Sequence, residues 1–372
     1  MERNIFSRNA GIHEIFKNEK VLYPEFIPER LPHRDREIDS LVYSFNPVIK
    51  GGKPINVSVF GPVGVGKTVT VKYVLNQLEE FTDRAKHLYV NCFEFNTRHS
   101  VLSKITAFLG RAIPRRGMAT DETYSMFLEA LEKSDFTPII ILDEVDQLFE
   151  KGEGSKLLYD LLRVFEYQKA RIGIVMLSNN MTMNFNLDER VRSSFTEEKI
   201  VFNPYTPQQL KDILIDRAEQ AFQKNVLHKD VIPLLAAKAA KSGGDCRTAI
   251  EALLKAGRLA EKENSKTVSV DHLRESFDSI ESSPAKKVLK HLSEPEKNLL
   301  KILAQSSKEL SSGELYEKYN ESNDPLTIRR LREFVTKLST LNIINAELNE
   351  GRGKTRLISL KLSKNIVLDE LK

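Results

Sequence analysis

The segment from Gly61 to Thr68, "GPVGVGKT", has the residue types and spacing of a loop that binds phosphate groups. Its glycines let the backbone curl so that N–H groups point inward, and it lies between an apolar run and a helical pattern. Lys67 is expected to reach the β- and γ-phosphates of a nucleotide, and Thr68 to ligate Mg²⁺. A chance match in a glycine-rich turn is the alternative. The expected nucleotide contacts are Gly61, Pro62, Val63, Gly64, Val65, Gly66, Lys67, Thr68 and Val69.

A second candidate site follows in "IIILDEVDQLF", where four apolar residues lead to Asp143 and Glu144. A buried strand would carry Asp143 to the edge of a sheet, where its carboxylate can hold Mg²⁺ through water. Glu144 beside it can polarise an attacking water. Phosphoryl transfer depends on positioning and charge neutralisation, so lysine, metal and base are needed together. A strand that ends in a solvated acidic turn is the alternative.

The elements around these residues are expected to form a doubly wound parallel sheet. Apolar runs at 55–61, 86–92, 138–146, 172–180 and 197–205 predict strands that are largely buried. Helical patterns at 66–80, 99–113 and 122–134 lie between them. Alternating buried strands and helices are typical of α/β proteins.

After Pro207 the pattern is helical. Four helical stretches fill 208–280, and "ESSPAKK" at 281–287 is expected to be a short linker. Three helices then lead to apolar alternation on both sides of the tip "NEGRGKTR", which predicts a β-hairpin. Three helices followed by a hairpin is the order of elements in a winged helix.

Composition narrows the class of protein. Two cysteines in 372 residues argue for a reducing compartment and against a cysteine-built metal site. We find neither a run of 18 apolar residues nor a signal-peptide core, and we expect a cytoplasmic, nucleoid-associated protein. The net charge of +4 is uneven, because residues 285–372 carry 17 Lys and Arg against 12 Asp and Glu. A basic terminal module suggests an anionic polymer as partner, and a solvated surface is the alternative.

The order of these motifs resembles one family across essentially the whole chain. The stretches that carry the resemblance, besides the two sites, are "VLYPEFIPERLPHRDREIDSL", "FNPYTPQQLKDILIDRAEQAF", "GGDCRTAIEAL" and the winged helix. They are similar to the archaeal replication initiators related to the origin-recognition-complex large subunit and to cell division control protein 6. The resemblance implies an AAA+ core at 1–205, an all-α lid at 206–283 and a DNA-binding winged helix at 284–372.

The resemblance also assigns roles to single residues. Asn179 in "LSNN" is similar to the polar residue, sensor 1, that contacts the γ-phosphate or the lytic water. The family usually has an acid after this residue, where Asn180 stands here. Arg247 in "GGDCR" is similar to sensor 2, a lid arginine that reaches the phosphates. Tyr205 and Arg217 match positions that flank the nucleotide, although Tyr205 could instead be a core aromatic.

The segment "LDERVRSSF" resembles one that presents an arginine to the nucleotide of a neighbouring protomer. Arg190 matches best and Arg192 second, while Glu189 stands where the family often has proline. An intramolecular ion pair is the alternative.

Two surfaces are expected to contact DNA. In a winged helix the third helix enters the major groove and the hairpin lies along the minor groove. The candidates are Arg329, Arg330 and Arg332 on that helix and Arg352, Lys354 and Arg356 on the hairpin. A protein-docking winged helix is the alternative. In the family an insertion before the Asp143 strand also touches DNA, which implicates Arg111, Arg115 and Arg116, unless they lie in a solvated loop.

The function that the resemblance implies is initiation of DNA replication. The chain would bind ATP or ADP with Mg²⁺, bind double-stranded origin DNA, and help recruit the MCM replicative helicase. Paralogous initiators are further candidate partners. Hydrolysis would be slow and act as a switch. One alternative is a DNA-bound regulator with little or no ATP turnover, and another is a clamp-loader-like or signalling AAA+ protein whose winged helix binds protein.

Overall fold

The structure is a computed structural model of the whole chain. It describes residues 14–371 except 112, 114–117, 168–170, 181–196, 242, 291, 307–308, 323, 342, 349–355, 362–366 and 369–370. The chain divides into two compact units, Met1–Leu273 and Arg274–Lys372. None of the described helices is both long and apolar enough to cross a membrane.

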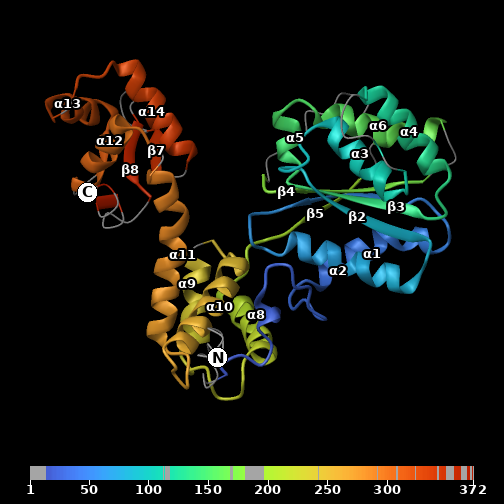
Figure 1. The fold of residues 1–372 in the computed structure, drawn as a ribbon, viewed down its shortest axis with the longest axis horizontal. Coiled ribbons are helices and arrows are strands. Elements are labelled where there is room, and N and C mark those ends of the chain that lie inside the picture. Colours follow the sequence, from blue (N-terminus) through green and yellow to red (C-terminus); the bar gives the residue numbers. More distant parts are fainter. Residues whose placement is uncertain are drawn as a thin grey trace, which may run out of the picture. The chain divides into compact units, whose positions relative to one another are not determined.

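The first unit is built on a five-stranded parallel sheet (Figure 1). Its strands are β1 (Asn56–Phe60), β2 (Ala85–Asn91), β3 (Thr137–Asp143), β4 (Gly173–Ser178) and β5 (Glu197–Val201). They lie in the order β2-β3-β4-β1-β5 and are parallel throughout. This confirms the expected α/β sheet, in which β1 and β3, the strands that lead to the two candidate sites, are separated by β4.

Helices cover both faces of this sheet (Figure 1). One face carries α1 (Asp35–Ile49) and α2 (Lys67–Phe81). The other carries α3 (Arg98–Phe108), α4 (Thr120–Glu132), α5 (Asp146–Glu150) and α6 (Gly154–Tyr167). Successive strand residues point to opposite faces, so Ile139 and Ile141 pack with α1 and α2, whereas Ile140 and Leu142 pack with the other layer. Burial on both faces is the reason that β3 is a nearly continuous apolar run.

The third helix is shorter than expected. The pattern predicts a helix over 99–113, but α3 ends at Phe108. Gly110 follows with a positive φ of 88°. A glycine in this left-handed conformation just past the last helical turn is a common way for a helix to end.

The lid helices complete the first unit. They are α8 (Pro207–Ala221), α9 (Val231–Lys241), α10 (Cys246–Lys262) and the start of α11 (Val270–Lys290). Residues 14–26, which we call the N-terminal strap, pack on these helices and include the 3-10 helix η2 (Glu19–Leu22) (Figure 1). The Lys17 N–H donates to the Ala221 carbonyl over 2.7 Å, and Ile15 is completely buried. The strap thus precedes the sheet in sequence but packs on helices that follow it.

The prediction of a linker at 281–287 is wrong, because α11 continues through these residues to Lys290. Proline lacks the N–H of a helical hydrogen bond and usually marks a boundary, and Pro284 lies inside this helix. Leu273 and Phe277 are buried before the segment, and Leu289 is buried after it. The helix therefore continues through a polar segment with little helical periodicity, and buried apolar residues lie on both sides of that segment.

The second unit has the winged-helix elements. Its helices are α12 (Glu294–Gln305), α13 (Ser312–Ser322) and α14 (Ile328–Thr340), and its strands are β6 (Leu310–Ser311), β7 (Ile344–Leu348) and β8 (Arg356–Leu360). β7 and β8 pair antiparallel, which confirms the expected hairpin, and β6 adds a third strand. Leucines 299, 303, 331 and 338 belong to its core. Through this core α14 packs against the sheet, and the opposite side of α14 is exposed to solvent.

Candidate functional site

The phosphate loop joins β1 to α2 as expected. Gly64 and Gly66 have φ values of 78° and 90°, in the left-handed region that favours glycine. A Cβ on Gly64 would lie 1.8 Å from the Asp245 carboxylate, and one on Gly66 would lie 2.8 Å from the Tyr205 hydroxyl. Only glycine fits at these two positions, both for conformation and for space.

Lys67, the first residue of α2, folds back over this loop. Its side chain is largely buried, and Nζ donates to the carbonyls of Gly61 over 2.7 Å and Pro62 over 2.8 Å. Its third donation goes to Asn179 Oδ1 over 2.9 Å. Burial lowers the pKa of Lys67, and the carboxylates of Asp143 and its neighbours oppose that shift. A phosphate oxygen entering the loop would compete with these carbonyls for an ammonium that is already positioned.

The Asp143 carboxylate lies where β3 ends and faces Thr68. Thr68 Oγ1 donates to Asp143 Oδ2 over 2.8 Å, and the Glu144 N–H donates to Oδ1 over 2.9 Å. Magnesium is bound in proteins through one or two carboxylates together with water and substrate phosphates. A hydroxyl and a carboxylate in contact, beside a phosphate loop, form a donor set that fits this ion. Among the described residues, no group of three or more His, Cys, Asp or Glu side chains could hold a metal ion.

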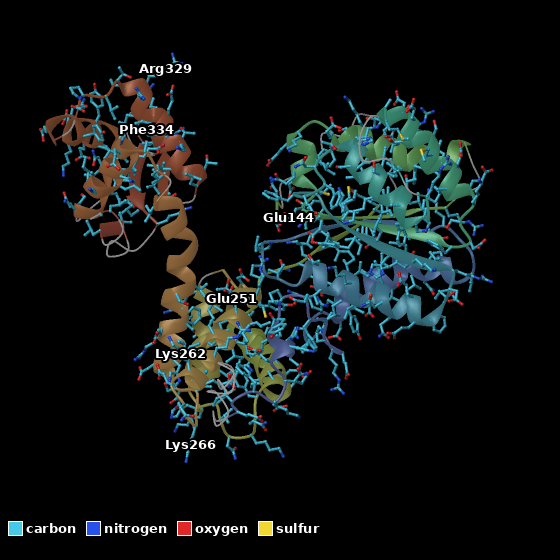
Figure 2. The ribbon with its side chains drawn as sticks, viewed as in Figure 1. Glu144, Glu251, Lys262, Lys266, Arg329 and Phe334 are labelled. Carbon is cyan, nitrogen blue, oxygen red and sulfur yellow. The ribbon has the colours of Figure 1, made fainter. Side chains whose placement is uncertain are left out.

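Glu144 lies at the end of the sheet (Figure 2) and has an unusual backbone conformation. Its φ of 55° is in the left-handed region, which costs a residue with a side chain about 1–2 kcal/mol. The next residue returns to the sheet, because the Val145 N–H donates to the Leu177 carbonyl over 3.1 Å. The side chain of Glu144 is half-buried and is close enough to Lys67 to raise the pKa of that ammonium.

Asp146 was missed by the sequence reasoning, although "DEVD" contains it. Its carboxylate accepts the Ser178 hydroxyl over 2.7 Å and the Asn179 N–H over 3.1 Å. It therefore holds the end of β4, from which Asn179 reaches Lys67. The sequence shows an acidic residue three positions after Asp143. Its hydrogen-bond partners lie at the end of β4, and the sequence alone does not reveal that contact.

The lid reaches the phosphate loop through the first turn of α10. The Cys246 N–H donates to the Gly64 carbonyl over 3.1 Å, and Asp245 caps the helix by accepting the Arg247 N–H over 2.9 Å. Arg247 is exposed at this end and is close enough to Lys67 to lower its pKa electrostatically. The structure therefore brings Lys67, Asp143, Glu144, Asn179 and Arg247 into one neighbourhood.

Tyr205 and Arg217, which are expected to flank the nucleotide, contact other residues of the first unit. Arg217 is buried, donates from Nη1 to the Val21 carbonyl of the strap over 2.9 Å, and lies over the Phe26 ring. Burial lowers the pKa of this guanidinium. The Tyr205 hydroxyl accepts from Arg34 Nε over 3.0 Å. Both residues lie where strap, lid and core meet, and Arg34 was missed because nothing in its local pattern points to this site.

The expected DNA contacts are described in part. On α14, Arg329, Arg330 and Arg332 are exposed, and Figure 2 shows Arg329 at the N-terminal end of the helix. Arg329 pairs with Glu333 over 3.2 Å on the same helix. Arg356 is exposed at the start of β8. In the core, Arg111 forms an ion pair with Glu129. Arg115, Arg116, Arg190, Arg192, Arg352 and Lys354 lie outside the described residues.

Family models match three successive parts of the chain. An AAA domain matches residues 54–180, the lid domain of the Cdc6 AAA+ ATPase type matches 211–278, and the C-terminal winged helix domain of CDC6 matches 288–370. The AAA domain, the lid and the winged helix follow one another in the order predicted from the sequence.

Relatives match over nearly the full length. The ORC1-type DNA replication protein of Thermococcus kodakarensis is 37% identical and covers 98% of this chain and 92% of the relative. ORC1-type DNA replication protein 1 of Archaeoglobus fulgidus is also 37% identical, with coverage of 98% and 92%. The solved structure of the Aeropyrum pernix ORC1 protein in complex with DNA is 34% identical, has a TM-score of 0.80 and covers 96% of both chains. This chain therefore belongs to the family of ORC1-type DNA replication proteins.

Proposed function

We propose that this chain is an ATP-dependent initiator of DNA replication that binds double-stranded origin DNA and helps recruit the MCM helicase. The observation that carries the proposal is the presence, in one chain, of a complete candidate nucleotide site and a winged helix whose third helix exposes three arginines. The Aeropyrum relative was solved in complex with DNA, which supports DNA binding by this chain. The protein would act in the cytoplasm, at the nucleoid.

The proposed chemistry is hydrolysis of ATP used as a switch. Bound Mg²⁺, held by Thr68 and Asp143, would supply neutralising charge at the phosphates. Lys67 would hold the β- and γ-phosphate oxygens, and Glu144 would orient and polarise the attacking water. Asn179 would contact the γ-phosphate side while it keeps its link to Lys67. Arg247 would report phosphate occupancy to the lid, because it lies in the first turn of α10, where the Cys246 N–H donates to the Gly64 carbonyl of the phosphate loop.

Further arginines complete the proposal. Arg190 or Arg192 would serve the nucleotide of a neighbouring initiator. Arg111, Arg115 and Arg116 would contact DNA from the core while Arg329, Arg330, Arg332, Arg352, Lys354 and Arg356 contact it from the winged helix. Contacts at two sites on one duplex would allow it to be bent or underwound between them.

The first test is recovery of sheared genomic DNA by the purified protein, followed by sequencing. Enrichment at a few discrete loci is expected for an initiator. Uniform recovery that disappears at moderate salt would indicate backbone binding alone and would contradict origin recognition.

The second test compares ATP turnover of the wild type with Glu144→Gln. Removal of a general base typically lowers the rate by about 10²–10⁴-fold. Binding of a fluorescent ATP analogue should persist, because the Lys67 contacts do not involve Glu144. Equal turnover rates in the two proteins would favour a DNA-bound regulator over an enzyme.

A further inference from the structure

Arg34 forms hydrogen bonds to three parts of the first unit, and it is not among the residues expected to contact phosphate. It lies just before α1 and is only 4% exposed. Its Nη2 donates to the Val65 carbonyl of the phosphate loop over 2.7 Å and to the Asn203 carbonyl over 3.2 Å. Its Nη1 pairs with Glu37 over 3.0 Å, so the buried charge is neutralised. A planar guanidinium with donors in fixed directions suits such divergent acceptors.

The remaining contacts of Arg34 are to Tyr205. Nε donates to the Tyr205 hydroxyl over 3.0 Å, and the guanidinium lies 3.9 Å from the centre of the same ring. A cation over a buried aromatic face adds attraction. Tyr205 is itself only 7% exposed. The ring is thus held both at its face and at its polar end.

Tyr205 is wedged between the phosphate loop and the lid. Its hydroxyl would lie 2.8 Å from a Cβ on Gly66, and its own backbone oxygen 2.9 Å from a Cβ on Gly244. Gly244 immediately precedes Asp245 and α10, and the Cys246 N–H bonds the Gly64 carbonyl. A movement of α10 relative to the loop must therefore displace Tyr205 or slide along it.

We propose that Arg34 is a positioning residue that fixes Tyr205 between Gly66 and Gly244 and thereby couples the shape of the phosphate loop to the orientation of α10. Its use in the cell rests on the proposed nucleotide binding. Loss of Arg34 would leave Tyr205 free to turn and the Val65 carbonyl without its donor. The loop would then bind nucleotide less tightly, and the lid would sample more orientations.

The first experiment measures lid order without nucleotide. Spin labels are placed at exposed positions of core and lid, through Asp83→Cys and Lys229→Cys, while the native Cys92 and Cys246 are buried. The distance distribution between the labels should broaden in Arg34→Lys and in Tyr205→Phe. Arg258→Met is the matched control, since Arg258 pairs with Glu19 on the strap, and it should keep the wild-type width. Unchanged widths in both test variants would overturn the proposal.

The second experiment measures affinity for a fluorescent ATP analogue in a double-mutant cycle. Loss of a hydrogen bond from a charged donor in a buried site is expected to weaken binding by about tenfold in Arg34→Lys. Because Arg34 and Tyr205 form one unit, the double variant should lose less than the product of the single effects. Independent, multiplicative losses would overturn the coupling. A wild type that binds no nucleotide would refute the proposed function, while the label widths would still decide the role of Arg34.

Discussion

The Tyr89 hydroxyl donates a hydrogen bond to Asp143 Oδ2 over 3.0 Å. It shares that oxygen with Thr68 Oγ1, and the Lys72 ammonium lies 3.7 Å from the centre of the Tyr89 ring. Burial and the nearby Asp143 carboxylate raise the pKa of Tyr89 far above its usual range, so the hydroxyl stays a donor at any working pH. Tyr89 comes from β2, the strand that pairs with β3. The candidate metal carboxylate is therefore oriented from a second strand.

Tyr89→Phe should lower ATP turnover by about tenfold, because a hydrogen bond to a charged group contributes about 1.5–3 kcal/mol. The Mg²⁺ concentration needed for half-maximal binding of a fluorescent ATP analogue should rise. Tyr124→Phe is the matched control, since the Tyr124 hydroxyl donates to a main-chain carbonyl, that of Asp160, over 3.3 Å. A Mg²⁺ dependence identical to that of the wild type would show that Thr68 and the Glu144 N–H orient Asp143 without Tyr89.

Substitutions at Glu144 should separate stability from activity, because its φ is positive. Glu144→Gly removes the backbone strain while it increases the freedom of the unfolded chain, so the free energy of unfolding should change by less than about 1 kcal/mol. Glu144→Val keeps the strained conformation and adds a β-branched side chain, for which it is less favourable still, so this variant should be less stable than Glu144→Gly by about 1–2 kcal/mol or more. Both variants should lose turnover. Equal thermal midpoints of the two variants would contradict strain at this position.

The buried Glu296 carboxylate should make the winged helix sensitive to acid. Burial alone would raise its pKa, but hydrogen bonds from Lys337 and Ser293 outweigh burial and leave the pKa below its usual value. A lowered carboxylate pKa stabilises the folded state above the unfolded pKa of about 4.3, and this stabilisation is lost as the pH falls through the lower, folded pKa. Glu296→Gln should therefore destabilise α12 and α14 by about 1–2 kcal/mol at pH 7.

Hydrogen exchange of α12 and α14 in the full chain measures this effect. The difference between Glu296→Gln and the wild type should shrink as the pH falls from the unfolded pKa of about 4.3 through the lower, folded pKa, where the wild-type carboxylate takes up its proton. Glu294→Gln is the control, because Glu294 is exposed and forms a surface pair with Lys297. A difference that stays constant with pH would assign the effect to packing rather than to charge.

Charge reversal on the winged helix should weaken binding to DNA. Arg329→Glu and Arg356→Glu each remove an exposed cation and add an anion, and affinity for a duplex should fall by about tenfold or more. The slope of affinity against salt should decrease by about 1 for each lost phosphate contact. Arg258→Glu, on the lid, is the matched control. Unchanged affinity in both winged-helix variants would favour a protein-docking role.

Local patterns were enough to predict the strands and the two motifs. The β3 run is apolar because both faces of the sheet are covered, and its polar end had to fall at Asp143. The phosphate loop at Gly61–Thr68 was likewise predictable, because its motif lies between a strand pattern and a helix pattern. The winged helix followed from helical periodicity and from alternation on either side of a glycine-containing tip.

Contacts between distant segments could not be predicted. Tyr89 meets Asp143 because β2 pairs with β3 in the register that sets Asn91 beside Asp143, and one sequence does not reveal that register. Arg34 meets Tyr205 across 171 residues. The helix through Pro284 was missed for another reason, since its support comes from buried leucines and a phenylalanine outside the weak segment itself.

The N-terminal strap has a mechanical consequence. The chain passes from the lid to the core between the strap and Arg34, and returns from the core to the lid between Asn203 and Pro207, so two covalent crossings join the two bodies. At the first crossing, His33 Nε2 lies 2.9 Å from Asp212 Oδ2 on α8. Because Arg34 donates to the Asn203 carbonyl, the two crossings lie next to each other. Such a narrow double attachment lets the lid turn about that one place and keeps it from drifting away from the core.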